Sequence, residues 1–124
     1  MARAESLCQA AGKKVDALAG PTSVATYARF LTSYLPIETK LLADVRGLTP
    51  PPGDEGTIAE MLGAQDKVID SDKQLQAAAQ ARNESLLGRL EDENAVLVTQ
   101  ANAKFDAYGI RSCAGRPAPS EPQW

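Results

Sequence analysis

Residues 22–47, TSVATYARFLTSYLPIETKLLADVRG, carry the pattern that decides the fold. Apolar residues recur at every third or fourth position, which is the spacing of one face of an α-helix. The members of this stripe are Tyr27, Phe30, Tyr34, Ile37, Leu41, Val45 and Leu48. Thr22 or Ser23 can cap the amino terminus with a side-chain oxygen. We therefore predict a long helix through about Gly47 that is among the most buried in the fold.

Pro36 lies inside this predicted helix. A proline in a helix interior removes one backbone hydrogen bond, and its ring clashes with the preceding turn. We therefore expect a kink around residues 33–36, or a break of the helix into two pieces.

Three further helices are expected, one before residues 22–47 and two after them. The first covers residues 4–18, with an apolar face that repeats at the same spacing. The third follows the proline-rich connector 49–56, where Thr57 and Glu60 form a T-x-x-E capping box. Asn83 can cap the fourth helix.

The fourth helix is expected to end at Gly109. Glycine suits the left-handed conformation that follows many helices, and Ile110 can supply the apolar contact of a Schellman motif. Residues 115–124 are rich in proline and have no apolar pattern, so we expect a flexible tail after a bundle of residues 1–114.

Short connections between successive helices make neighbours antiparallel, so the sequence predicts an all-α, up-down-up-down four-helix bundle. Cys8 and Cys113 lie near opposite ends of this chain, and the predicted topology brings them to one end of the bundle. A Cys8–Cys113 disulfide that ties the ends together is expected; the alternative is two unrelated buried thiols.

The composition of the chain restricts its expected binding partners and its expected cellular compartment. The 13 basic and 16 acidic residues give a net charge of −3, so the surface lacks the positive charge that nucleic-acid binding requires. No apolar run approaches the roughly 20 residues of a transmembrane helix. A structural disulfide implies an oxidising compartment, so we expect a secreted or extracytoplasmic protein whose signal peptide has been removed, with Met1 an added start residue.

The sequence contains no histidine, which excludes Ser-His-Asp and Cys-His catalytic pairs and the commonest zinc and di-iron ligand sets. The S-x-x-K, G-x-G-x-x-G and P-loop motifs are also missing. Asp70-Ser71-Asp72 lacks the glycine and the closing glutamate of a calcium loop. We therefore expect no catalytic residue, no metal and no cofactor.

Four polar residues interrupt the apolar stripes or lie just beyond the Pro36 kink: Glu38, Gln65, Asp72 and Asn94. If they converge, they form a polar pocket for a cation or a small polar ligand, because buried charges need partners. Alternatively they lie at the bundle edge, or Gln65 and Asn94 hydrogen-bond across the core and set the helix register. Tyr34, one turn before Glu38, either contacts a ligand or fills the core.

Four segments together resemble small secreted or lipid-anchored helical proteins of actinobacterial cell envelopes. They are the early Cys8, the segment YLPIE at 34–38, the turn LTPPPGDE at 48–55 and the ending YGIRSC at 108–113. In such proteins the domain usually follows a signal peptide, often with a lipid-modified cysteine and a flexible linker. The resemblance implies an envelope location, with a lipid anchor on the full-length protein, and it supplies no catalytic residues.

Two functions are compatible with these observations. The first is a non-enzymatic secreted or envelope-associated module that binds a protein or cell-wall partner through an exposed helical face or groove. The second is a carrier that opens at the Pro36 kink and holds a small apolar or amphipathic ligand in a pocket lined by Tyr34, Ile37 and Leu97. An enzyme would require a carboxylate pair from Glu38 and Asp72 with raised pKa values.

Overall fold

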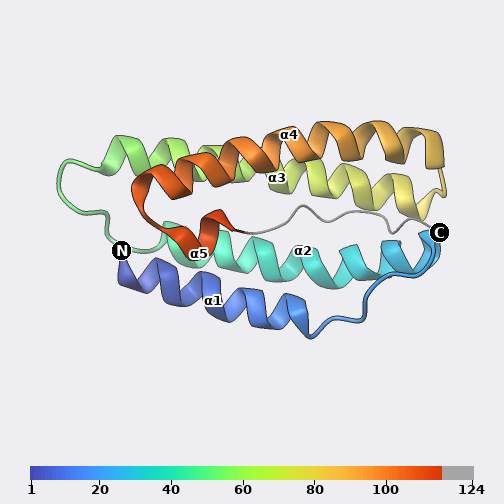
Figure 1. The fold of residues 1–124 in the computed structure, drawn as a ribbon, viewed down its shortest axis with the longest axis horizontal. Helices are drawn as coiled ribbons and strands as arrows, with labels where there is room; N and C mark the ends of the chain where they lie inside the picture. The colour runs from blue at the N-terminus through green and yellow to red at the C-terminus, as the bar shows by residue number, and fades with distance from the viewer. Residues whose placement is uncertain (116–124) are drawn as a thin grey trace.

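The computed structural model describes residues 1–115, and these residues form helices joined by short loops, with no β-strand among them (Figure 1). Four long helices run antiparallel to their neighbours in chain order, and a short helix follows. Their bounds are α1 Ala2–Asp16, α2 Val24–Arg46, α3 Glu55–Gln80, α4 Glu84–Tyr108 and α5 Arg111–Ala114. The predicted all-α bundle is confirmed. The predicted flexible tail falls almost wholly on residues 116–124, outside the described residues.

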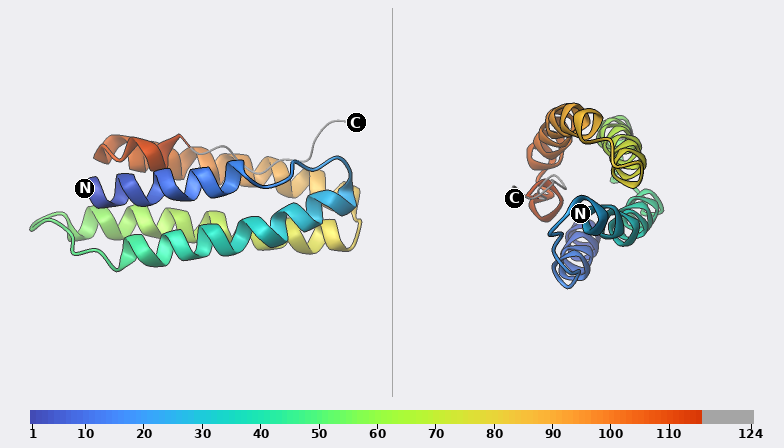
Figure 2. Two further views of the ribbon diagram at one scale, coloured as in Figure 1. Left: turned by 90° about the horizontal axis from the view of Figure 1, so that it is seen from below. Right: turned by 90° about the vertical axis from the view of Figure 1, so that its right-hand side faces the viewer.

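The helices form a ring in which each long helix packs against the next one in the chain. α2 packs against α1 and α3, and α3 packs against α4. The short α5 packs against both α4 and α1, and the end-on view of Figure 2 shows it between them. The four predicted long helices are therefore present, but α5, which the sequence analysis did not predict, completes the ring.

Side-chain capping interactions explain the amino-terminal ends of two helices, α2 and α4. The Ser23 side chain accepts a hydrogen bond from the Thr26 backbone N–H, and the Thr26 side chain accepts one from the Ser23 N–H. Asn83 Oδ1 accepts from Leu86 N–H at 3.2 Å. Side-chain oxygens thus satisfy amide groups that have no partner within the helix. The predicted caps at Ser23 and Asn83 are confirmed.

The carboxyl end of α4 is the predicted Schellman motif. Gly109 has φ 95°, in the left-handed region, and its N–H donates to the Asp106 carbonyl. The Ile110 N–H donates to the Phe105 carbonyl at 3.0 Å, and the Ile110 side chain is fully buried. This turn redirects the chain into α5.

The predicted start of the third helix is wrong. α3 begins at Glu55 with Asp54 as its N-cap residue, so Thr57 and Glu60 lie inside the helix and form no capping box. The Glu55 carboxylate accepts a hydrogen bond from Gly53 N–H at 3.0 Å. The Tyr108 hydroxyl donates to Asp54 Oδ2 at 2.6 Å and holds the N-cap residue against the end of α4.

Pro36 does not break α2, which is helical from Val24 to Arg46. In the side view of Figure 2 the helix curves toward its amino-terminal end. The Pro36 ring is exposed, so the missing N–H and the freed carbonyl one turn earlier lie on the solvent side of the helix. The predicted break is therefore wrong, and the curvature agrees with the predicted kink.

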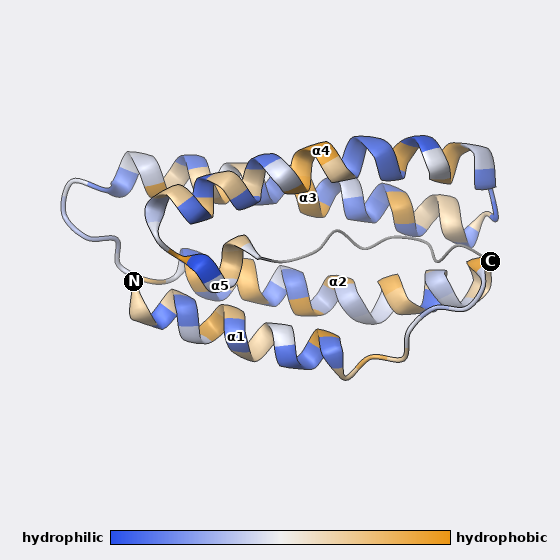
Figure 3. Ribbon diagram, in the orientation of Figure 1, coloured by the Kyte–Doolittle hydropathy of each residue, from blue (hydrophilic) through white to orange (hydrophobic). Residues whose placement is uncertain are grey.

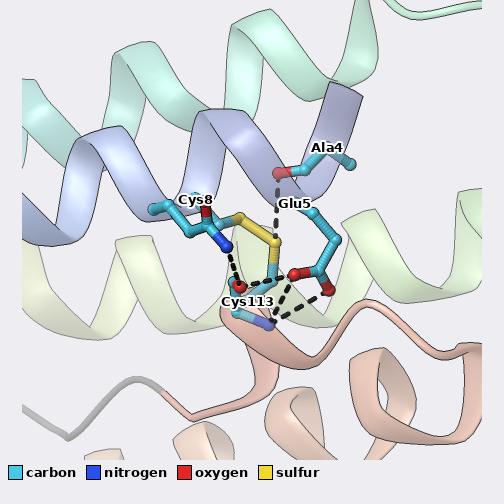
Figure 4. Close-up of a disulfide and its surroundings, with 6 residues drawn as sticks. Ala4, Glu5, Cys8 and Cys113 are labelled. Carbon is cyan, nitrogen blue, oxygen red and sulfur yellow. Dashed lines mark hydrogen bonds between the residues drawn. A yellow bond between two sulfur atoms is a disulfide. The ribbon is translucent and has the colours of Figure 1, made fainter. Parts of the chain in front are cut away.

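The predicted disulfide joins Cys8 in α1 to Cys113 in α5, with a Cα–Cα distance of 5.3 Å. The Glu5 carboxylate accepts hydrogen bonds from the Ser112 backbone N–H and hydroxyl, next to the two cysteines (Figure 4). Gln9 Nε2 donates to the same hydroxyl at 3.3 Å. A polar clamp therefore reinforces the covalent link between the first and last helices.

The buried apolar side chains form two clusters. The disulfide-side cluster contains Cys8 and Cys113 with Leu42, Met61 and Phe105 among its members. The opposite cluster contains the side chains Tyr27, Leu31, Tyr34, Leu75, Ala78, Ala79, Leu87 and Leu90. Figure 3 shows that each long helix also carries hydrophilic residues along its length, as expected for helices with one face in the core.

Candidate functional site

Buried polar side chains lie between the two apolar clusters. We call these residues the polar layer: Glu38, Ser71, Asp72 and Asn94. Glu38 is 3% exposed, and Asp72 and Asn94 are 0% exposed. Buried polar groups in a helical core are stable only when hydrogen bonds replace their contacts with water. The layer is therefore the part of the core whose chemistry needs explanation.

The helix register brings the members of the layer to one level. Arg46 pairs with Asp66 at 2.8 Å near one end of the α2–α3 contact, and Gln76 donates to Thr32 at 3.0 Å near the other. Between these two contacts, the antiparallel register places Glu38 of α2 at the height of Asp72 of α3.

Asn94 connects α4 to α3 within the polar layer. Its Nδ2 donates to Asp72 Oδ1 at 2.7 Å and to Ser71 Oγ at 3.0 Å. Both N–H groups of the amide are therefore used. Asp72 Oδ2 and Asn94 Oδ1 are buried and have no hydrogen-bond partner.

Burial raises the pKa of Asp72 from 3.8 to about 7, and the hydrogen bond from Asn94 opposes part of this shift. Burial acts in this direction because an ionised carboxylate loses its hydration in the core. The side chain is fully enclosed, so a substrate cannot reach it unless the bundle opens. The arrangement favours a structural or proton-binding role for Asp72 over a catalytic one.

The five predicted site residues do not meet in one pocket. Tyr34 lies in the opposite apolar cluster, where its ring stacks on Phe30 with centroids 5.6 Å apart. Gln65 is half-buried and lines a small cavity beside the disulfide. Glu38 lines the same cavity, whereas Asp72 and Asn94 bind each other.

The small cavity also contacts both cysteines and Phe105. Its volume of about 20 Å³ is enough for one water molecule. It cannot hold an apolar ligand. Within residues 1–115, no three His, Cys, Asp or Glu side chains group in a way that could hold a metal ion.

A larger concave surface lies outside the core, between α1 and α2. We call it the α1–α2 groove; its volume is about 270 Å³, and its lining residues are Leu7, Ala10, Ala11, Lys14, Pro36, Ile37, Lys40, Leu41 and Asp44. Ile37 therefore faces this groove, and Leu97 lines a different surface hollow between α3 and α4. The predicted carrier pocket of Tyr34, Ile37 and Leu97 does not form in the described residues.

Sequence reasoning missed Ser71 and the polar clamp of Glu5, Gln9 and Ser112. Ser71 precedes Asp72, and its small side chain allows the Asn94 amide to bind both residues. The clamp joins residues more than 100 positions apart, and its only local signal is its proximity to the two cysteines.

None of the helices in residues 1–115 combines the length and the apolar character needed to cross a membrane. No protein-family model matches this chain, and neither the curated proteins nor the solved structures include a significant match.

Proposed function

We propose that this chain is a non-enzymatic module of the extracytoplasmic cell envelope, which binds a protein or cell-wall partner through the α1–α2 groove. The groove itself is the observation that supports this function. Its floor is apolar, with Leu7, Ile37 and Leu41 each half-buried. Partly exposed apolar side chains in a concave surface gain stability when a partner covers them.

Residues with small or compact side chains line both walls of the groove and keep it open. Ala10 and Ala11 give α1 a low surface where it faces α2, and Pro36 presents a compact ring on the opposite side. Charged side chains form the rim: Lys40 pairs with Asp44 at 2.7 Å, and Lys14 lies on α1. An apolar floor with a charged rim suits the apolar side chain of a partner that carries polar groups around it.

The open shape of the groove favours one of the two candidate functions. Small-molecule sites typically enclose about 300–1,000 Å³ and cover most of the ligand. The α1–α2 groove, at about 270 Å³, is close to the lower end of this range, and it lies open on the surface. It therefore suits docking of a partner better than enclosure of a carried molecule. An amphipathic ligand, in the alternative function, would lie along the groove beside Pro36.

The envelope location in this proposal is supported by the disulfide, because such bonds persist in oxidising compartments outside the cytoplasm. Attachment of the full-length protein through a lipid belongs to the same proposal, on the resemblance to envelope proteins. Both are tested by locating the tagged full-length protein in cell fractions.

The binding function is tested with two matched variants. Ala10→Arg fills the α1–α2 groove, whereas Ala77→Arg adds the same side chain at an exposed position between α3 and α4. Immobilised wild-type protein should retain a component of envelope extract at both low and high salt. Ala10→Arg should lose that component, and Ala77→Arg should keep it.

Three results would count against the proposal: no retained component, equal retention by Ala10→Arg, or loss only with Ala77→Arg. Native mass spectrometry of the purified protein tests the alternative. A small molecule that co-purifies with the wild type and is displaced in Ala10→Arg would favour the carrier function.

A further inference from the structure

Two oxygen atoms in the middle of the fold lack any donor. Asp72 Oδ2 and Asn94 Oδ1 are completely buried, and neither accepts a hydrogen bond. A buried acceptor without a donor is costly, and a negatively charged one is more so. Both atoms belong to side chains that already bind each other through Asn94 Nδ2 and Asp72 Oδ1, at 2.7 Å.

The amide donors of the pair are already used. Asn94 has two N–H groups, and they donate to Ser71 and Asp72. An ionised Asp72 has no hydrogen to donate, so it leaves both atoms unsatisfied. A protonated Asp72 has one O–H donor, and this single group can satisfy both atoms at once. One hydrogen bond would then replace two unsatisfied acceptors.

We propose that Asp72 and Asn94 form a buried proton-binding site, in which Asp72 is a neutral carboxylic acid whose Oδ2–H donates to Asn94 Oδ1. The two side chains then form a reciprocal acid–amide pair, with one hydrogen bond in each direction. Ser71 accepts the remaining amide N–H and orients the pair. The ligand of this site is a proton, which the carboxylate takes up from solvent when the chain folds.

The charged groups around Asp72 agree with this assignment. α3 packs against α2 and α4. Glu38 of α2 lies at the same level, and Glu91 of α4 lies one turn before Asn94; both are acids, so neither supplies a positive charge that would stabilise an ionised Asp72. On α3 itself, Asp70 and Lys73 are exposed. No salt bridge joins Asp72 to a described residue.

Binding of the proton makes the hydrogen bonds between Asp72 and Asn94 dependent on pH. Burial raises the pKa of Asp72 to about 7. While the proton is bound, the pair joins α3 to α4 through two hydrogen bonds. When the pH rises above neutrality, the proton leaves, the Oδ2–H donor disappears and a negative charge remains in the core. The contact between α3 and α4 should loosen in that range.

The ¹³Cγ chemical shift of Asp72, measured by NMR on the whole wild-type chain, tests the proposal directly. The signal is assigned by its loss in Asp72→Asn. At about pH 5.5 an ordinary aspartate is ionised, whereas Asp72 should still be protonated. Its titration midpoint should lie near 7, compared with 3.8 for an unshifted aspartate. The midpoint should be the same in sodium, potassium and calcium chloride at equal ionic strength.

Two results would overturn the proposal. An ionised Asp72 at about pH 5.5 would show that a water or another donor satisfies the site. A midpoint that depends on which cation is present would show that the oxygens bind a metal ion. The variant Asp70→Asn is the matched control, because it removes an exposed aspartate from the same helix and should leave the Asp72 titration unchanged.

Discussion

Cys8 and Cys113 are 105 positions apart in the sequence, and the fold brings their Cα atoms to 5.3 Å. The bond between them closes nearly the whole described chain into one loop. In the chain-entropy treatment, a closed loop of about 100 residues stabilises the folded state by up to about 4.7 kcal/mol. We therefore expect Cys8→Ala with Cys113→Ala to lower the free energy of unfolding by about 2–5 kcal/mol in urea denaturation.

Mass spectrometry checks the bond itself. Alkylation of the denatured, unreduced protein should label no thiol, and alkylation after reduction should label two. Two labelled cysteines before reduction would contradict both the disulfide and the oxidising compartment.

The substitution Asp72→Asn should make the free energy of unfolding less dependent on pH between about 4 and 7. Because the pKa of Asp72 is raised in the folded state, its contribution is complete below about pH 4 and is lost as the pH rises toward 7. The rise from 3.8 to about 7 corresponds to roughly 4 kcal/mol over that range. Asparagine keeps the hydrogen-bonding pattern of a neutral acid at every pH.

The measurement is urea denaturation of wild type and Asp72→Asn from about pH 4 to 8, with Asp70→Asn as control. The wild type should lose stability relative to Asp72→Asn as the pH rises, whereas Asp70→Asn should follow the wild type. Parallel curves for wild type and Asp72→Asn would be the contrary outcome.

Asp54→Asn should lower the pKa of Tyr108. The hydrogen bond from the Tyr108 hydroxyl to Asp54 raises that pKa above 10.0, with smaller contributions from burial and from the Asp54 charge. Removing the carboxylate removes both the strong acceptor and the charge. The difference between the ultraviolet titrations of wild type and variant should show Tyr108 ionising at lower pH. Tyr108→Phe is the control, because the shifted transition should be missing in that variant.

Two glycine substitutions should have opposite effects. Gly88 lies inside α4, and a Cβ placed there meets no atom within 4 Å, so Gly88→Ala should stabilise the protein by about 0.5–1 kcal/mol. Gly109 has φ 95°, so Gly109→Ala should destabilise it by about 1 kcal/mol. Thermal unfolding of both variants measures the difference. Equal shifts in one direction would show that backbone conformation does not govern these positions.

Local signals explain why much of the fold could be predicted. Ser23 and Asn83 bind amides three residues away, and Gly109 adopts a conformation that glycine favours. These effects depend on a few consecutive residues and need no partner elsewhere. The predicted start of α3 is wrong, and the contact at its true start is not local. The N-cap residue Asp54 accepts a hydrogen bond from Tyr108, which lies 54 positions away in the sequence.

The candidate site could be predicted only in part. The sequence identified Asp72 and Asn94 as polar residues that interrupt the apolar stripes and Glu38 as a polar residue just beyond Pro36, and all three are buried. It also grouped them with Gln65, which is half-buried and lines the small cavity beside the disulfide instead. A rotation of a helix by a fraction of a turn moves a side chain between these environments, and the periodicity of apolar residues does not define rotation that closely.

By itself the sequence determined the helical class, most helix ends and the pairing of the only two cysteines, because these depend on local spacing and on the order of antiparallel helices. The tertiary structure decided that Asn94 binds Asp72, that α5 completes the ring between α1 and α4, and that a groove opens beside Pro36. Each of these depends on the register and rotation of two helices. Packing over the whole core sets both quantities, so no single segment contains them.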